Sequence, residues 1–505
     1  MKKHWYALLD SMKLPLAILL IGYLLMGLNV ISVKNELIST ALQTLEYIGY
    51  VMVDLFPLIV IISYFGRTYE DSAPVNGGII CYLILNVITM FFSNGSLADS
   101  FYTDLFTFSV DAENTIRPLN MGLLAAVIVI IIVNLTYRSS RKRYNYGMLP
   151  FITNDVWFLL SAILFTLIVG ALIVWQYPTV ARFTVKCMRF VAINNTNPAS
   201  MFLYSLYDKV MSLTGLHGIV EKGFWFGEYG GNWVNGSGTS FVGDASIWNA
   251  QIAADTLSKG VGRYGTNYYI VNLFMIPSLL LGYLLNIRDK VELRKSWGTV
   301  LFGLICSLLC GSALPVELAL LFIAPGLLFV HVILSSLSSM ALALMGVQLG
   351  FTVTGNPDYT AAGTLLDFVK YFRTASLHSA ALKILLVGAV CFAVYQLAVF
   401  LYYRFISQDF LDNEEGKKEL KDFVRALGGL ENIKMITSSP TSVIVVLHDN
   451  EKLDPKALLE TRAYLIKERY FGYHINYGPG SPALCRMIKK EIRELEEIKN
   501  YHKEA

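Results

Sequence analysis

Apolar segments follow one another along the first four-fifths of this chain. They lie near residues 14–30, 49–65, 77–94, 119–136, 156–178, 268–286, 298–312, 318–349 and 380–403. Each long segment can cross ~30 Å of hydrocarbon as a helix. Several segments are short or contain Gly and Pro, as happens where non-helical backbone lines a cavity. We therefore predict an all-α polytopic membrane domain over residues 1–404, with about ten spans or half-spans and with re-entrant hairpins.

The composition agrees with this interpretation. Hydrophobic residues make up 54% of the chain and charged residues 16%, whereas about a quarter of a soluble chain is charged. The net charge of +3 argues against a nucleic-acid partner. The six cysteines are scattered and form no C-x-x-C pair. We interpret them as small apolar residues in packed helices and expect no metal site and no cofactor.

Lysine and arginine predict the orientation of the chain in the bilayer. Segments 138–144 and 288–295 are basic, whereas segment 95–118 carries one arginine against four acidic residues. Basic loops stay in the cytoplasm, so we expect the N-terminus and both basic loops inside and 95–118 outside. No small-residue cleavage site follows the apolar run 14–30, which we interpret as a retained first span.

Charged residues concentrate in the last hundred positions, which predicts a separate, cytoplasmic α/β domain over residues 405–505. The charge order and Gly428-Gly429 predict a first helix that ends there. A β-branched run predicts a strand, and Asp454 is the expected N-cap of the helix after it. The predicted elements are helix 414–427, strand 441–447, helix 455–467, strand 470–477 and helix 482–500.

One acid stands alone in the most apolar part of the chain. Between Trp297 and Asp358 the only formal charge is Glu317. An ionisable group at bilayer depth costs a few kcal/mol or more, so it usually faces a cavity and marks a substrate or ion path. The alternative is a structural partner for Lys, Arg or a helix N-terminus.

The middle of the chain is more polar and rich in glycine. Arg182, Lys186 and Arg189 recur on one helical face, which predicts an amphipathic interfacial helix. The glycine-rich stretch 215–232 follows, and its glycine density suits a re-entrant hairpin where backbone approaches a ligand. His217 lies in this stretch.

Four motifs resemble one family, the glucose-superfamily sugar permeases of the bacterial phosphoenolpyruvate phosphotransferase system. Gly215-Leu-His-Gly-Ile is similar to the family's G-L-H-H-I, and Gly243-Asp244 to the G-D that follows it. Residues 311–325 resemble the family's G-I-T-E-P-I-E-F-x-F-x-F-V-A-P motif. In the tail, residues 427–433 resemble F-G-G-K-E-N-I. The motifs occur in the family's order and cover nearly the whole chain.

The resemblance implies a membrane transport domain (IIC) fused to a cytoplasmic domain (IIB), in a multi-pass protein of the bacterial cytoplasmic membrane. It implies a homodimer whose hairpin-bearing half, residues 215–350, moves by an elevator-like shift against a scaffold of the first five spans. The implied substrate is a sugar of the glucose, N-acetylglucosamine or α-glucoside class. The implied partners are the lipid bilayer and a phosphocarrier protein, either IIB or IIA.

The same resemblance implies the sugar ligands. We assign His217 and Glu317 as substrate-binding and catalytic residues, with Gly215 and Trp225 beside them in the site. A carboxylate accepts hydroxyl hydrogen bonds and can act as a base, and histidine can donate to a hydroxyl. The alternatives are a hairpin-packing role for His217 and an interfacial anchor for Trp225.

Four other polar residues are weaker candidates for sugar ligands: Glu221, Glu228, Asp244 and Asn249. The alternative for each is a place in a solvated loop. Phe224 is an aromatic that could stack on a pyranose beside Trp225. His331, in the middle of a span, is interpreted as a hydrogen-bonded packing histidine.

The chain departs from the family at positions that carry chemistry. Gly218 replaces the second hairpin histidine, and Leu314 replaces the first glutamate of the third motif. Ser439 stands where the family has its phosphocysteine, and Ser442 and Ile444 replace two arginines. A serine hydroxyl needs an adjacent base, and none is apparent. We therefore predict a IIB-like domain that has no phosphoacceptor.

Three hypotheses remain open at this stage. In the first, the chain is a sugar transporter of the IIC type, and a cysteine-bearing IIB supplied in trans phosphorylates the sugar. In the second, it is a permease that moves sugar without phosphorylating it. In the third, it is a membrane sugar sensor with a degenerate IIB domain.

Overall fold

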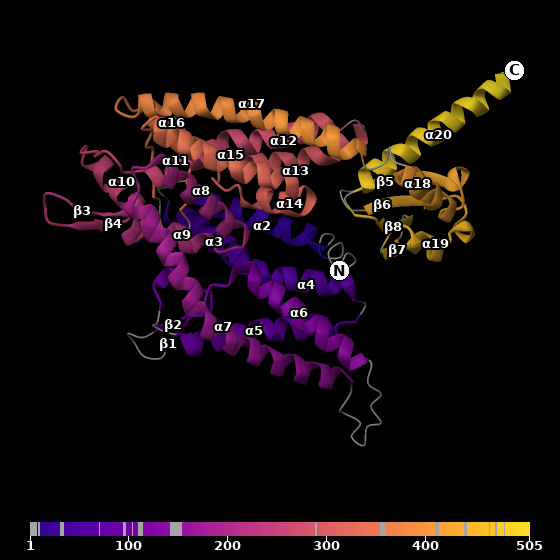
Figure 1. Ribbon diagram of the computed structural model, residues 1–505, viewed down its shortest axis with the longest axis horizontal. Coiled ribbons are helices and arrows are strands. Elements are labelled where there is room, and N and C mark those ends of the chain that lie inside the picture. The colour runs from indigo at the N-terminus through magenta and orange to yellow at the C-terminus, as the bar shows by residue number, and fades with distance from the viewer. Residues whose placement is uncertain are drawn as a thin grey trace.

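A helical region fills most of the computed structural model, and a small α/β region lies at one end of it (Figure 1). The structure describes residues 8, 11–30, 35–69, 71–93, 97–103, 105–109, 115–141, 154–287, 290–353, 360–409, 414–438, 442–463, 465–469, 472–478 and 480–504.

The first helical group has its own apolar core, which includes Phe65, Leu85 and Phe158. Helix α3 begins where the Asn35 side chain accepts hydrogen bonds from two backbone N–H groups, and α3 and α4 together are bent by 57°. The elements of this group are α2 (Lys13–Met26), η1 (Gly27–Val30), α3 (Glu36–Asp54), α4 (Phe56–Thr68), α5 (Ala73–Ser93), η2 (Asp99–Phe101), β1 (Phe108–Ser109), β2 (Thr115–Ile116), α6 (Gly122–Arg141) and α7 (Asn154–Ile193).

The second helical group is organised around a larger core that includes Trp248, Tyr269 and Tyr395. Proline in the first turn starts α8, α14 and α15, because a helix needs no N–H there. The elements are α8 (Pro198–Leu213), α9 (His217–Glu221), η3 (Lys222–Phe226), η4 (Glu228–Gly230), β3 (Asn232–Val234), β4 (Ser240–Val242), α10 (Asp244–Ala253), α11 (Arg263–Ile270), η5 (Val271–Met275), α12 (Ile276–Asn286), α13 (Lys290–Leu308), α14 (Leu314–Ile323), α15 (Pro325–Leu344), α16 (Leu365–Arg373) and α17 (His378–Asp409).

Not all of the roughly ten predicted spans and half-spans are full-length spans. Six helices in the described part of the chain are long and apolar enough to cross a membrane, and the bent pair α3–α4 makes a seventh. The other predicted spans or half-spans correspond to shorter apolar helices: Lys13–Met26, Ser296–Leu308 and Leu314–Ile323. The region is mostly helical rather than all-α, because β1–β2 and β3–β4 form two antiparallel hairpins.

The predicted interfacial helix is not a separate element. The segment 182–190 continues α7, a single helix of 40 residues that passes through Pro178. Proline removes one backbone hydrogen bond but leaves the rest of the ladder in place. The basic residues Arg182, Lys186 and Arg189 are exposed along it.

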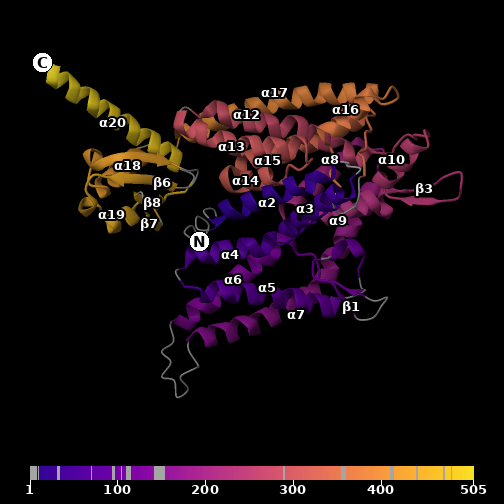
Figure 2. The ribbon, with the colours of Figure 1, turned by 180° about the vertical axis from the view of Figure 1, so that it is seen from behind.

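The two helical groups lie side by side, and α2, α3 and α14 lie between them (Figures 1 and 2). The hairpin β3–β4 projects at the end opposite the tail. The end of α6, the start of α7 and the start of α2 lie at the tail end. The described helix ends that flank the expected inside loop after α6 therefore lie at the same end of the molecule as the tail.

The tail has its own core, beneath a four-stranded antiparallel sheet of order β5-β6-β8-β7. Helices α18 and α20 pack on the face that presents Val443 and Val445. The elements are α18 (Glu414–Ala426), η7 (Leu430–Asn432), β5 (Ile433–Ser438), β6 (Ser442–Leu447), η8 (Asn450–Lys452), α19 (Pro455–Glu460), β7 (Leu465–Arg469), β8 (Gly472–Asn476) and α20 (Ser481–Glu504).

The tail elements confirm most of the predicted pattern. Gly428 and Gly429 end α18 with positive φ, and the Asp454 side chain caps α19 as expected. The predicted helix 455–467 is wrong in its second half, because α19 ends at Glu460 and residues 465–469 pair with β8 as a strand. Ser439 and residues 142–144 of the basic segment 138–144 lie outside the described residues.

Candidate functional site

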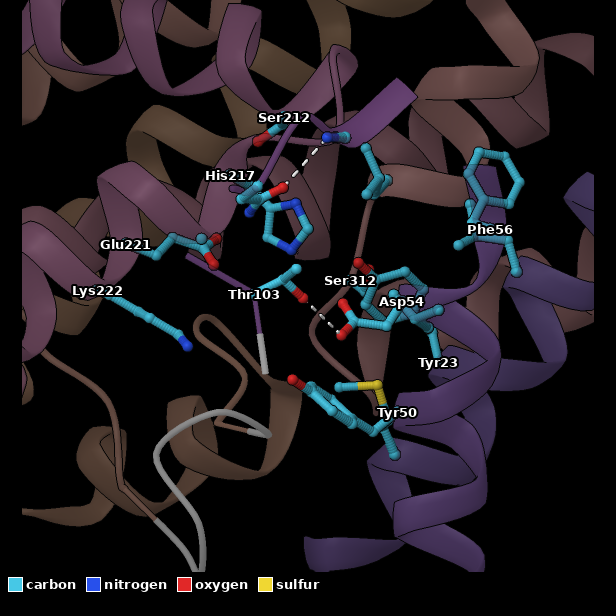
Figure 3. Close-up of a pocket in the computed structure, with 18 of the residues that line it drawn as sticks. Tyr23, Tyr50, Asp54, Phe56, Thr103, Ser212, His217, Glu221, Lys222 and Ser312 are labelled. Carbon is cyan, nitrogen blue, oxygen red and sulfur yellow. Dashed lines mark hydrogen bonds between the residues drawn. The ribbon is translucent and has the colours of Figure 1, made fainter. Parts of the chain in front are cut away.

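A cavity of about 230 Å³ lies between the two helical groups. One wall comes from α2, α3, α4 and the segment that leads into α6. The other comes from α8, α9, η3 and the start of α14. Figure 3 shows Tyr23 and Asp54 on one side of this cavity and His217 and Glu221 on the other. The Asp, Glu, Lys and His residues of the lining are Asp54, Lys209, His217, Glu221, Lys222 and Glu317.

Glu317 lies in the first turn of α14 and lines the cavity with only 1% of its surface exposed. Its Oε1 accepts a hydrogen bond from Lys209 Nζ at 2.6 Å. The Lys209 side chain, from α8, is itself 6% exposed. Glu317 is thus both the structural partner of a lysine and a wall of the cavity, so the two hypotheses for this residue are not exclusive.

His331 holds the same carboxylate from a third helix. Its Nε2 lies 3.0 Å from Glu317 Oε1, and its Nδ1 lies 3.2 Å from the Tyr395 hydroxyl on α17. The ring is fully buried. His331 is therefore hydrogen-bonded through both ring nitrogens, as expected of a packing histidine. One of its two partners is Glu317, the candidate sugar ligand.

The hairpin that carries His217 depends on two glycines. Gly215 has φ +76°, and Gly122 has φ +50° with space for no side chain, because a Cβ would lie 2.4 Å from the Thr214 carbonyl. The carbonyl of Thr214 accepts a hydrogen bond from Leu123 N at 2.8 Å, which ties the hairpin to the start of α6. The His217 ring projects into the cavity in Figure 3.

His217 has a free hydrogen-bonding position. Its Nδ1 is buried, and no group among the described residues is bonded to it. A buried ring nitrogen in a native structure normally has a partner. A ligand hydroxyl would supply one here.

Beyond His217 the chain forms α9 and the π-helical turn η3, which place Glu221 and Trp225 on the cavity wall. Trp225 is 3% exposed and packs edge-on against Tyr268 and Phe351. Trp225 is thus part of the apolar wall and not an exposed anchor. The Tyr268 hydroxyl lies 3.2 Å from Glu221 Oε1 and 2.9 Å from Asp208 Oδ2.

The sequence interpretation missed three charged cavity residues, Asp54, Lys209 and Lys222. Asp54, at the end of α3, lies in the apolar segment 49–65, and its Oδ2 accepts a hydrogen bond from Thr103 at 3.3 Å. The argument that singled out Glu317 applies to Asp54 as well. Lys209 had no such signal, because it lies next to Asp208 in the more polar middle of the chain, where a charge does not stand out.

Four candidates lie elsewhere. Glu228 is exposed in η4, and Phe224 is buried among Tyr204, Tyr229 and Tyr264. Asp244 accepts backbone hydrogen bonds from Gly262 and Tyr264, and Asn249 bonds the backbone of Phe351 and Val353. None of them lines the cavity. Asp244 and Asn249 hold the loops behind the hairpin.

The arrangement offers acceptors, donors and an apolar wall to one guest. Carboxylates accept hydroxyl hydrogen bonds strongly, the lysines and His217 can donate, and Trp225 supplies a flat apolar surface. Such a set fits a neutral polyhydroxylated molecule better than an apolar one. Among the described residues, no group of three or more His, Cys, Asp or Glu side chains is arranged to hold a metal ion.

Comparison with known proteins identifies the family. A family model described as the phosphotransferase system, EIIC, matches residues 9–336. The chain is also similar to a solved structure, the transporter ChbC, the IIC component from the N,N'-diacetylchitobiose-specific phosphotransferase system. The identity is 14% with a TM-score of 0.30, over 81% of this chain and 95% of that chain. The family model covers more than half of the chain, so this protein belongs to the EIIC family of the phosphotransferase system and is a multi-pass membrane sugar transporter of the EIIC type.

Proposed function

We propose that this transporter binds a sugar of the glucose, N-acetylglucosamine or α-glucoside class in the cavity between the two helical groups. One observation carries the proposal: the paired acid Glu317 and His217, whose buried Nδ1 has no partner among the described residues, line the same cavity. Both residues belong to motifs that resemble those of the glucose superfamily. Gly215, with its positive φ, forms the turn just before His217.

Each residue has a defined role in this proposal. Lys209 and His331 both bond Oε1 of Glu317, so the carboxylate stays charged and its other oxygen accepts a sugar hydroxyl. His217 Nδ1 bonds a second hydroxyl, and Trp225 packs on the apolar face of the ring. In a phosphorylating cycle, Glu317 would also be the base for the hydroxyl that attacks phosphorus.

We further propose that the tail is a IIB-like domain that cannot carry the phosphoryl group. Ser439 stands at the phosphocysteine position, and Ser442 and Ile444 replace the arginines that would suit a phosphate dianion. Phosphate would then come from a cysteine-bearing IIB supplied in trans. The corresponding test is incubation of the purified protein with phosphoenolpyruvate and the soluble phosphotransferase proteins: we expect no label on the tail, and labelling of Ser439 would overturn this step.

Residues 1–404 are the proposed transport domain and 405–505 the proposed cytoplasmic domain. The basic ends of α2 and α6 lie at the same end as the tail in Figure 1, which supports a cytoplasmic tail. The homodimer and the elevator-like movement of residues 215–350 rest on the family resemblance. Cross-linking in native membranes tests the dimer.

Vesicle transport distinguishes the three functional hypotheses. Vesicles containing the protein are supplied with labelled glucose, N-acetylglucosamine or methyl α-glucoside, phosphoenolpyruvate and the soluble components. Sugar phosphate that appears only when a cysteine-bearing IIB is added supports phosphorylation in trans. Free sugar inside the vesicles supports a non-phosphorylating permease, and binding without flux supports a sensor. Absence of binding by all three sugars would refute the assigned substrate class.

A further inference from the structure

One hydroxyl group lies between a buried acid and a half-buried acid at the cavity. The Tyr268 hydroxyl is 2.9 Å from Asp208 Oδ2 and 3.2 Å from Glu221 Oε1. A tyrosine hydroxyl has a single hydrogen to donate, and an ionised carboxylate can only accept. One hydrogen can point fully at only one of the two acceptors. The second contact becomes a full hydrogen bond when that carboxyl group carries a proton and donates it to the tyrosine oxygen. The geometry thus favours one proton more than two ionised acids would hold.

A second observation points to the same place. Asp208 is 3% exposed, and its Oδ1 has no hydrogen-bond partner among the described residues. Glu221, on the other side of Tyr268, lines the cavity. The pair therefore joins a buried, incompletely bonded carboxyl group to one that a guest in the cavity can reach.

The surrounding charges do not neutralise this pair. Lys209 Nζ lies 5.7 Å from the centre of the Tyr268 ring, but its hydrogen bond goes to Glu317 at 2.6 Å. Lys222, from η3, and His217, from α9, are the other nearby groups that can carry positive charge, and Asp54 faces them from α3. Four acids (Asp54, Asp208, Glu221 and Glu317) thus lie in or beside a cavity with two lysines.

We propose that Asp208, Tyr268 and Glu221 form a proton-binding site linked to the sugar site, so that this transporter moves one proton with each sugar. The inference rests on the proposed sugar site. The proton passes from water outside onto one carboxyl group of the pair and leaves that group for water inside; no other bond forms or breaks. A proton gradient can then drive uptake in a chain whose tail has serine at the phosphocysteine position.

Proton linkage can be measured without transport. Binding of glucose, N-acetylglucosamine and methyl α-glucoside to the purified full-length protein is followed by titration calorimetry, in buffers that differ in ionisation enthalpy. We expect uptake of up to one proton per bound sugar, with affinity increasing as pH falls, because linkage is reciprocal. Sugar binding with no proton exchange would overturn the inference and leave the sugar site intact. Failure of all three sugars to bind would instead refute the proposed function.

Glucosamine separates this proposal from the other explanation of an acidic cavity. If the excess acids serve to bind a cationic amino sugar, glucosamine should bind much more tightly than glucose and without proton uptake. That result would overturn proton coupling. Weaker or equal binding of glucosamine agrees with the proposal.

Transport assays on variants test whether these residues carry the proton. In proteoliposomes whose outside is one pH unit more acidic than the inside, the sugar that binds should accumulate inside to about ten times its outside concentration. One proton moving inward with each sugar supplies about 1.4 kcal/mol. Asp208→Asn, at the acid of the site that does not line the cavity, should still bind sugar but lose gradient-driven accumulation and proton uptake. Asp367→Asn, at a buried acid of α16 outside the cavity, is the matched control and should keep both. Accumulation by Asp208→Asn equal to that of the unmodified protein would overturn the proposal.

Discussion

At the scale of single residues, the main question is how a charged pair is kept within an apolar region. Lys209 and Glu317 are nearly fully buried and bonded at 2.6 Å, and His331 bonds the same oxygen. Burying each ion separately costs several kcal/mol, and a close partner offsets most of that cost. The pair can therefore persist in the membrane region and still present one carboxylate oxygen to the cavity.

Glu317→Gln should lower both stability and sugar affinity. The substitution leaves the Lys209 ammonium buried without its counter-ion, which should cost about 3–5 kcal/mol of unfolding free energy. The double variant Lys209→Met, Glu317→Gln should recover most of the stability but not the binding. Thermal unfolding in detergent and sugar titration measure the two effects. A double variant no more stable than Glu317→Gln would show that the pair is not what holds the carboxylate.

Outside the spans, Asp71 should make stability depend on pH. The Ala73 backbone N–H and then the Tyr137 hydroxyl, with Arg141 beside them, lower the pKa of Asp71. A lowered folded-state pKa contributes stability above the unfolded value of about 3.9, and this contribution is lost as pH falls through the folded value. Asp71→Asn should lower the melting temperature at pH 7 and have progressively less effect towards pH 3. An equal difference at every pH would assign the effect to hydrogen bonding alone.

At the scale of elements, helix contacts through glycine set one wall of the cavity. Gly22 of α2 and Gly49 of α3 face each other, and a Cβ on Gly49 would lie 2.5 Å from the Gly22 carbonyl oxygen. These two helices carry Tyr23 and Asp54. Their close approach thus fixes where those side chains lie.

Gly49→Ala should push α2 and α3 apart. Overpacking of this kind costs about 1–3 kcal/mol, and the shifted wall should also weaken sugar binding. Gly66→Ala in α4 is the matched control, because its Cβ would meet no atom within 4 Å and alanine favours the helix. Melting temperatures and sugar affinities of both variants test the prediction. Equal behaviour of the two would mean that the crossing relaxes without cost.

At the scale of the whole molecule, side-chain hydrogen bonds join described residues of the tail to the helical region. Lys13 Nζ donates to Ser442 Oγ at 3.3 Å, and Lys467 Nζ donates to the Arg67 carbonyl at 3.3 Å. The apolar core of the tail includes no residue of the helical region. Each region therefore has the apolar core that it needs to fold by itself.

A chain ending at residue 409 should keep the sugar site. No described residue beyond 409 lines the cavity, so we expect sugar affinity within about twofold of the full chain. Expression, monodispersity and titration of the shortened protein measure this. A large loss of affinity in a well-folded shortened protein would give the tail a direct part in binding.

The sequence by itself determined the elements whose signal is local. Long apolar runs predicted the helical membrane region, and a shift in charge predicted the tail with its Gly428 stop and Asp454 cap. Where the outcome depended on a partner strand, as in residues 465–469, the local pattern gave the wrong element. Local sequence contains no information about which strand lies beside it.

The site was predictable only in part, for the same reason. Glu317 was predicted because an isolated charge is unusual in an apolar segment. His217 was predicted because it lies in an unusually glycine-rich stretch. Only the tertiary structure brought Lys209 and His331 to Glu317. It also placed Tyr268 between Asp208 and Glu221. Pairing between distant helices depends on how apolar surfaces pack, and the sequence alone does not specify which buried charges that packing brings together.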